Sequence, residues 1–423
     1  MDSKEKIKKW LSENTNTGVK FLQRLVQEPS KRGQEGKAQA IVVEKCRELG
    51  LSIDLWEIGD DKLKSHANFH CDRTHFEGNP NLAAVKPGKG GGKSIILNSH
   101  IDVVPEGNLK DWHDDPFSGI VKDGRVYGRG STDMKGGTAS LLLALESLIA
   151  NGIDLKGDVI FQSVIEEESG GAGTLATVLR GYKADGAIIP EPTNMKLFPL
   201  QQGSMWFRIT VKGKSAHGGT RYEGVSAIEQ AMKVIAELQR LEKARNIRLN
   251  HPLYKNIPIP IPINIGKFSS GDWPSSVPDV AVIEGRMGIA PIEKVKEAEQ
   301  DLEECISRLN SEDPWFVAKT VELQWFGARW LPGSLELEHP LMEALSKNYT
   351  SVLGDNPIIE ASPWGTDGGL LSNIGDTPVV VFGPGTTAVA HDANEYIEIS
   401  KIFKSAEIIA CTLIDWCGEA GVK

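Results

Sequence analysis

The stretch Ile95-Ile-Leu-Asn-Ser-His-Ile-Asp-Val-Val104 joins an apolar run to a histidine and an aspartate that stand two residues apart. A short apolar run of this kind predicts a buried strand, which we place over residues 94–98. Residues i and i+2 of an extended chain project to the same face, so His100 and Asp102 should lie together. Because open α/β sheets bind ligands at the carboxyl ends of their strands, we expect a functional site at this edge.

Strand and helix patterns alternate on both sides of this stretch. The segment before residue 28 and residues 37–49 show helical spacing, so two helices are expected before the first strand. The alternation predicts an α/β fold with a sheet flanked by helices. The other expected strands are residues 51–58, 81–85, 158–165, 186–189 and 378–382, and the other expected helices are residues 139–149, 340–352 and 400–416.

The order of elements changes at about Ser204. Strand and helix patterns then follow one another as βαββαβ, which is typical of a ferredoxin-like sandwich. They comprise residues 207–211, 225–242, 262–266, 280–287, 292–309 and 321–325. The α/β pattern resumes near residue 335, so we predict one discontinuous domain of residues 1–203 and 332–423, with a domain of residues 204–331 inserted in it.

Composition limits the class of protein. The 423 residues exceed what one core usually holds, and the formal net charge of −10 argues against a nucleic-acid partner. Five dispersed cysteines without a Cys-x-x-Cys pair are typical of reduced thiols. The chain shows neither a signal-peptide pattern nor a run of ~18 apolar residues. We therefore expect a cytoplasmic protein without a membrane partner.

Acids and imidazoles recur where apolar runs or glycine-rich segments end. Taken singly, each is more often a helix cap or a structural residue, but together they favour a metal site. Two histidines with several carboxylates suit Zn²⁺, with Co²⁺ or Mn²⁺ as substitutes, better than Mg²⁺ or Ca²⁺. The positive charge of two divalent ions would be balanced by the negative charges of three carboxylate ligands and a hydroxide. The residues are His100, Asp102, Asp133, Glu167, Glu168, Glu191 and His391.

Glu167 and Glu168 are neighbours, so their side chains point to different sides of an extended chain. One of them could bind metal while the other acts as a general base for an activated water. A metal ligand next to a general base predicts a hydrolase.

The order of these motifs resembles that of the M20 metallopeptidase/deacylase family, which includes acetylornithine deacetylase, succinyl-diaminopimelate desuccinylase and aminoacylase-1. The resemblance covers nearly the whole chain. It rests on Ser99-His-Ile-Asp102, Gly128-Arg-Gly-Ser-Thr-Asp-Met-Lys-Gly-Gly137, Glu166-Glu-Glu-Ser-Gly-Gly171, Glu191-Pro192 and His391-Asp-Ala-Asn-Glu395. It implies a zinc-peptidase-like mixed sheet with an inserted lid and dimerisation domain, and a homodimer formed through that lid.

The resemblance also implies a role for each site residue. Asp133, followed by a cis peptide, would bridge two Zn²⁺ ions, and Glu167 would be the general base that assists a metal-activated hydroxide. Asp102 would orient the ring of His100. The remaining ligands would be His100 and Glu191 for one ion, and Glu168 and His391 for the other.

The inserted domain would contribute to substrate binding. His217 matches a histidine that reaches into the partner's active site and stabilises an oxyanion, although it could be an ordinary histidine at a lid-surface turn. Arg286 matches an arginine that binds a substrate carboxylate, although it could be a solvated charge. Gly365, Thr366 and Gly383 are the other expected substrate contacts.

Two departures from the family pattern bear on the substrate. The chain reads Gly365-Thr-Asp-Gly-Gly369 where many relatives have a nearby arginine, and Trp273-Pro-Ser-Ser-Val-Pro278 where several have an asparagine. We expect hydrolysis of a small N-acylated amine or amino acid, as in acetylornithine deacetylase. The alternatives are a formylaminopyrimidine deformylase, a succinyl-diaminopimelate desuccinylase, a dipeptidase or carboxypeptidase, and a non-catalytic metal-binding protein.

Overall fold

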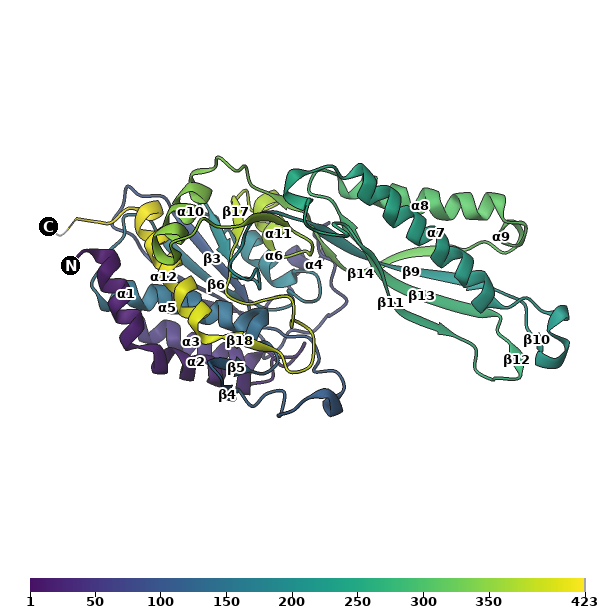
Figure 1. Cartoon of the computed structure of the whole chain (residues 1–423), viewed down its shortest axis with the longest axis horizontal. Coiled ribbons are helices and arrows are strands. Elements are labelled where there is room, and N and C mark those ends of the chain that lie inside the picture. Colours follow the sequence, from purple (N-terminus) through teal and green to yellow (C-terminus); the bar gives the residue numbers. More distant parts are fainter. Residues whose placement is uncertain (422–423) are drawn as a thin grey trace. The chain divides into compact units, whose positions relative to one another are not determined.

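The structure, a computed structural model, describes residues 1–421. The chain divides into two compact units (Figure 1). Unit 1 comprises Met1–Leu200, Gly333–Ser362 and Thr366–Lys423, and unit 2 comprises Gln201–Pro332 and Pro363–Gly365. Unit 2 thus begins three residues before the expected position, Ser204, and it also takes in a short segment near residue 364.

Unit 1 contains a nine-stranded mixed sheet in the order β1-β2-β6-β3-β7-β17-β8-β15, with β16 paired to β8. Its centre is parallel, because β3 pairs in parallel with both β6 and β7. All residues of β3 and β6 are buried, as expected for central strands covered on both faces. The strands are β1 (Ser52–Trp56), β2 (Asn81–Lys86), β3 (Ile95–His100), β6 (Val159–Val164), β7 (Ala187–Ile189), β8 (Leu197–Gln201), β15 (Gly333–Ser334), β16 (Ile359–Ser362) and β17 (Val379–Val381).

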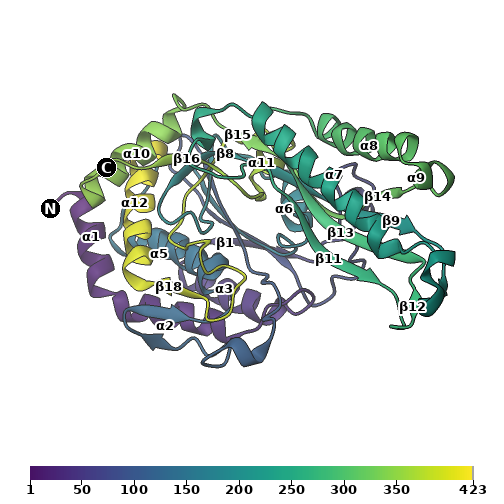
Figure 2. The same ribbon diagram turned by 45° about the vertical axis from the view of Figure 1, so that its right-hand side comes forward.

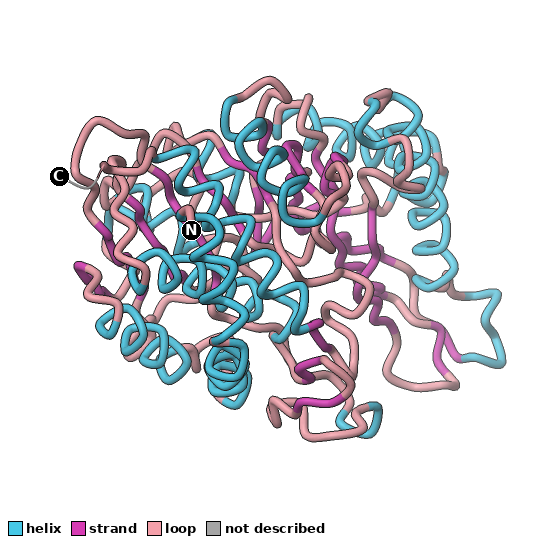
Figure 3. Tube along the Cα trace, turned by 60° about the vertical axis from the view of Figure 1, so that its left-hand side comes forward, coloured by secondary structure: helices cyan, strands magenta, loops and turns pink. Residues whose placement is uncertain are grey.

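Helices flank this sheet (Figures 2 and 3). Helix α5 is buried on nearly every side, which explains its apolar sequence. Helices α1 and α12 pack beside it. The helices of unit 1 are α1 (Ser3–Glu13), α2 (Thr15–Gln27), α3 (Gly36–Glu48), α4 (Asp61–Lys64), α5 (Gly136–Ala150), α6 (Ala172–Leu179), α10 (Pro340–Leu353), α11 (Gly368–Asn373) and α12 (Ile399–Cys417). Within residues 1–421, no helix combines the length and apolarity needed to cross a bilayer.

Three features of unit 1 differ from the sequence prediction. Three helices precede β1 instead of two, because the opening segment is divided at Asn14, whose side chain donates to the carbonyl of Trp10 and competes with the helical pattern. Strand β8 was missed because Pro199 weakens its strand signal. A three-stranded sheet of short strands was also missed; it consists of β4 (Val121–Lys122), β5 (Arg125–Tyr127) and β18 (Tyr396–Glu398).

Unit 2 is an antiparallel sheet in the order β11-β13-β9-β14 with two long helices, which confirms the ferredoxin-like prediction. Alternate residues of β9, such as Phe207 and Ile209, pack in one core with Leu238 of α7 and Leu302 of α8. The elements are β9 (Gly203–Lys212), α7 (Ala227–Arg248), β11 (Ile263–Ser270), β13 (Val280–Ile289), α8 (Val295–Glu312), α9 (Pro314–Ala318), β14 (Glu322–Trp330) and a two-stranded pair of β10 (Ala216–His217) and β12 (Ser276–Val277).

Candidate metal centre

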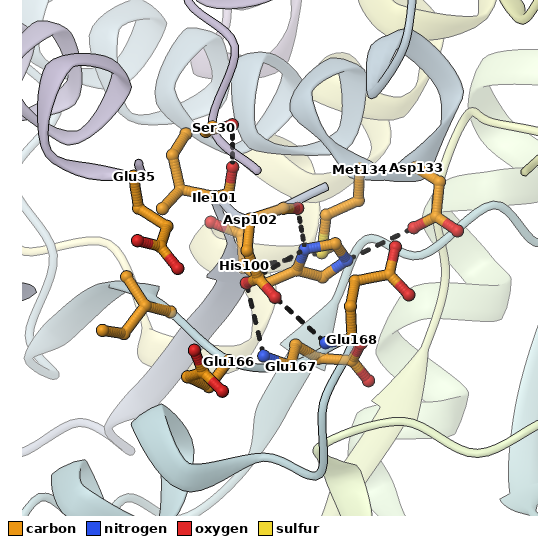
Figure 4. Close-up of polar contacts among 12 residues, drawn as sticks. Ser30, Glu35, His100, Ile101, Asp102, Asp133, Met134, Glu166, Glu167 and Glu168 are labelled. Carbon is orange, nitrogen blue, oxygen red and sulfur yellow. Dashed lines mark hydrogen bonds and ion pairs between the residues drawn. The ribbon is translucent and has the colours of Figure 1, made fainter. Parts of the chain in front are cut away.

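His100 is the last residue of β3, and its side chain is buried. The ring Nδ1 lies 2.9 Å from the backbone carbonyl oxygen of Asp102, whereas the Oδ1 atom of that residue is 3.7 Å away. Figure 4 shows Asp102 and Asp133 on opposite sides of the ring. The carbonyl oxygen of Asp102 is therefore the nearer hydrogen-bond partner of Nδ1. With the ring proton on Nδ1, the lone pair of Nε2 is available for a metal ion.

The carboxylate of Asp102 has a different contact. It accepts hydrogen bonds from the backbone N–H groups of Glu167 and Glu168, at 3.3 and 3.1 Å (Figure 4). These two residues follow β6, which is the neighbour of β3 in the sheet. Asp102 thus links the end of β3, which carries His100, to the end of β6, which is followed by Glu167 and Glu168.

Asp133 lies in the short segment Ser131–Lys135, where its own backbone angles are not helical, and the peptide bond to Met134 is cis, as the family resemblance implies. Its Oδ1 is 3.2 Å from Nε2 of His100, and its Oδ2 is 3.3 Å from Nε2 of His391. One carboxylate therefore lies between two imidazoles, with one oxygen directed to each of them.

The other acids lie around this core. Oε1 of Glu168 is 3.2 Å from Nε2 of His391, and Oε1 of Glu191 is 3.8 Å from Nε2 of His100. Among the described residues, two groups have ligand atoms within 4.8 Å of one another, namely His100, Asp133 and Glu168, and His100, Glu167 and Glu191. The structure thus brings together the seven residues that the sequence analysis identified.

The electrostatics of the cluster fit a cation. Burial, with added repulsion from neighbouring carboxylates, raises the pKa values of Glu167 and Glu191 well above their usual range. Burial also raises the pKa of Asp102 to about 8. The charge of Glu168 raises the pKa of His391 to about 11. The mixed imidazole and carboxylate donors suit Zn²⁺, and divalent ions would offset the repulsion among the acids.

A supporting acid, Glu395, received no role from the sequence. Its buried carboxylate accepts from Nη1 of Arg129 at 2.5 Å, and from the backbone N–H groups of Gly130, Thr132 and Asp133 at 3.0, 2.8 and 3.2 Å. Glu395 belongs to the same loop as His391, so it fastens that loop to the segment carrying Asp133. Its only sequence signal was its place four residues after a candidate histidine ligand.

Asp367 is a second acid that received no role. It is buried, which raises its pKa to about 6, and its charge contributes to the raised pKa values of Glu167 and Glu191. In the sequence analysis Asp367 was named only as part of the stretch Gly365-Thr-Asp-Gly-Gly369, and nothing marked it as a site residue. It adds negative charge close to the candidate metal site.

The expected substrate residues are divided between the units. In unit 1, Thr366 accepts from the N–H group of Gly368 at 3.0 Å, and Gly383 packs on the chain at Glu191, where a Cβ atom would lie 2.3 Å from the Glu191 carbonyl oxygen. Gly383 thus has a packing role beside a candidate ligand. His217, Arg286 and Gly365 belong to unit 2.

Within unit 2, His217 is exposed on β10 and pairs with Ser276 of β12, and its Nδ1 accepts from the N–H group of Gly219 at 3.0 Å. Trp273, just before β12, is 68% exposed. Arg286 lies on β13, opposite Trp206 of β9, and burial lowers its pKa to about 10.

A mixed α/β sheet whose strand ends and loops bring two imidazoles and several carboxylates together is the framework of a metal-dependent hydrolase. The chain belongs to peptidase family M20/M25/M40, whose family model matches residues 96–415.

A curated relative is the N-formyl-4-amino-5-aminomethyl-2-methylpyrimidine deformylase of Bacillus subtilis, which is 32% identical over 92% of this chain and 91% of its own length. Among solved structures, the dipeptidase Dug1p of Saccharomyces cerevisiae has a TM-score of 0.80, at 15% identity and 99% coverage of both chains. The YXEP protein of Bacillus subtilis, a dinuclear metal binding peptidase of the M20 family, has a TM-score of 0.62, at 19% identity, and covers 97% of this chain and all of its own.

Proposed function

We propose that this enzyme binds two Zn²⁺ ions and hydrolyses the amide bond of a small N-acylated amine, with an N-formylated aminopyrimidine as the first substrate to test. The observation that carries the proposal is the carboxylate of Asp133, which lies between the imidazoles of His100 and His391. The choice of substrate is supported by the 32% identity to the deformylase. It is also supported by the missing arginine after Gly365-Thr-Asp-Gly-Gly369.

The residues of the cluster divide naturally between two ions. His100 with Glu191 would hold one ion and His391 with Glu168 the other, while Asp133 would be shared. Divalent ions bound there supply Lewis-acid polarisation of an amide carbonyl and lower the pKa of water. The protein's contribution is to fix the ligand geometry through the contacts of Asp102 and Glu395.

Glu167 is the proposed general base. It is buried among the ligands and is not needed in either proposed ligand set. Its carboxylate would take a proton from the attacking water and return it to the nitrogen of the departing amine. The raised pKa of Glu167 suits an acid that must both accept and donate this proton.

His217 is proposed to stabilise the oxyanion from across a dimer formed through unit 2. Its exposure on a short strand pair agrees with a side chain that acts outside its own unit. Mixing inactive His217→Ala and Glu167→Gln chains, with subunit exchange, should restore activity, because a mixed dimer holds one site with both groups intact. Activity no higher than that of the separate variants would contradict this role.

Removal of metal should destabilise the protein. Without cations the buried carboxylates repel one another, and a tightly bound ligand typically stabilises a fold by about 4 kcal/mol at 1,000 times its Kd. Dialysis against a chelator is therefore expected to lower Tm by roughly 5–10 °C, with recovery on addition of Zn²⁺. Calorimetry checks this, and an unchanged Tm after verified metal loss would argue against a buried centre.

A hydrolysis screen tests the proposed function. The panel would contain N-formyl, N-acetyl and N-succinyl amines, including an N-formylated aminopyrimidine, beside a set of dipeptides. We expect the largest kcat/KM for an N-acylated amine. Preference for dipeptides would assign the enzyme to the dipeptidases, and the absence of hydrolysis with a fully metal-loaded enzyme would contradict the proposal.

A further inference from the structure

We propose that Glu166, held by Arg32 and Arg73, is a positioning residue that orients the turn carrying Glu167 and Glu168. The inference rests on the proposed hydrolytic function, since it concerns how a base and a metal ligand are presented. Glu166 would act only through its two neighbours.

The side chain of Glu166 is completely buried and strongly paired. Nε of Arg32 donates to its Oε1 and Oε2 at 3.2 and 2.9 Å, and Nη1 of Arg73 donates to its Oε1 at 2.6 Å. The thiol of Cys71 donates to Oε2 at 3.2 Å. Charge-assisted hydrogen bonds of this kind are short and directional, so they fix the carboxylate in one place.

The backbone at Glu166 needs such fixing. Its φ angle is +63°, in the left-handed region that non-glycine residues seldom adopt. The turn is held at two further points, because the Glu166 carbonyl accepts from the N–H of Gly171 at 2.8 Å and Asp102 accepts from Glu167 and Glu168. A costly conformation of this type persists only where surrounding contacts over-determine it.

The side chains that follow depend on this conformation. Oε1 of Glu168 lies 3.2 Å from Nε2 of His391, and Glu167 belongs to a group with His100 and Glu191 whose ligand atoms are within 4.8 Å of one another. A change of φ at Glu166 would turn both side chains away from these positions. Both metal affinity and turnover should therefore depend on Glu166.

Glu35 provides a matched control. It is also fully buried, and its Oε1 accepts from the same Nη1 atom of Arg73, at 2.7 Å. Glu35 directly precedes α3 and is not part of the turn. Glu35→Gln and Glu166→Gln thus each remove a negative charge that pairs with Arg73, but only Glu166 belongs to the turn that carries Glu167 and Glu168.

The experiment compares wild type, Glu166→Gln and Glu35→Gln. Visible absorption would follow Co²⁺ titration of the metal-free proteins, alongside kcat, KM and Tm. For Glu166→Gln we expect Co²⁺ affinity and kcat to fall about 10- to 100-fold with little change in KM. Glu35→Gln should keep both quantities near wild type, even if its Tm falls equally. Equal losses in the two variants, or a Glu166→Gln enzyme with normal Co²⁺ affinity and kcat, would overturn the proposal.

Arg73→Lys is the second variant, for the case in which Glu166→Gln does not fold. Lysine keeps the charge but loses the planar fork of the guanidinium, so a smaller loss of Co²⁺ affinity is expected. Wild-type affinity in this variant would overturn the proposal. Because Co²⁺ binding needs no substrate, this readout remains valid even if the wild-type enzyme hydrolyses no compound in the screen, a result that would contradict only the proposed function.

Discussion

Replacing Glu167 by glutamine is expected to lower kcat about 10²- to 10⁴-fold while both metal ions remain bound. The reason is that the amide keeps the shape of the side chain but cannot accept the proton of the attacking water. Metal content measured by elemental analysis, together with kcat, checks the prediction. The proposed function requires that activity is lost while metal is retained. Loss of a metal ligand would remove the ion as well, whereas loss of the base removes only the proton transfer.

The neighbouring glutamate is the control for this prediction. Glu168→Gln should lose metal as well as activity, because Oε1 of Glu168 lies 3.2 Å from His391 in the cluster. If Glu167→Gln lost metal and Glu168→Gln retained it, the two roles would have to be exchanged.

Asp133→Asn should abolish the paired centre. The two oxygens of Asp133 lie 3.2 Å from Nε2 of His100 and 3.3 Å from Nε2 of His391, so an amide leaves one side without an anionic ligand. We expect no more than one tightly bound ion. A bound metal ion stabilises the transition state by several kcal/mol. Losing one ion should therefore lower kcat by at least ~100-fold.

Asp102→Asn separates this effect from a general disturbance of the site. Asp102 is buried beside the cluster, but its carboxylate contacts backbone N–H groups and makes no hydrogen bond to an imidazole. This variant should keep both ions and lose about 10- to 100-fold in activity. Two tightly bound ions in Asp133→Asn would contradict the bridging role.

The fold could be predicted from sequence wherever apolar periodicity was long. Strands β3 and β6 and helix α12 were expected close to their observed bounds, and the order of elements in unit 2 was correct, because packing of a continuous apolar face determines these elements. Short or interrupted elements were missed. Pro199 concealed β8, and Asn14 divided a segment whose apolar pattern continues on both sides of it.

From the sequence it was possible to predict which groups at strand ends lie together, but not the contacts that support them. His100, Glu191 and the Glu167–Glu168 pair stand where a strand ends, so their convergence followed from the sheet. Glu395 and the arginines around Glu166 act through long-range contacts to backbone and side chains, which local periodicity does not encode. Nδ1 of His100 lies closer to the carbonyl oxygen of Asp102 than to its carboxylate, and a difference of this kind follows from atomic distances that the sequence pattern does not contain.

The most direct test is a titration of the metal-free wild-type enzyme with Zn²⁺ while hydrolysis of an N-formylated aminopyrimidine is followed. Activity should be absent at first, rise with added metal and level off near two ions per chain, and Glu167→Gln should bind the same amount without turnover. Hydrolysis that proceeds without metal, or that Glu167→Gln retains in full, would contradict the assignment of a binuclear hydrolytic centre.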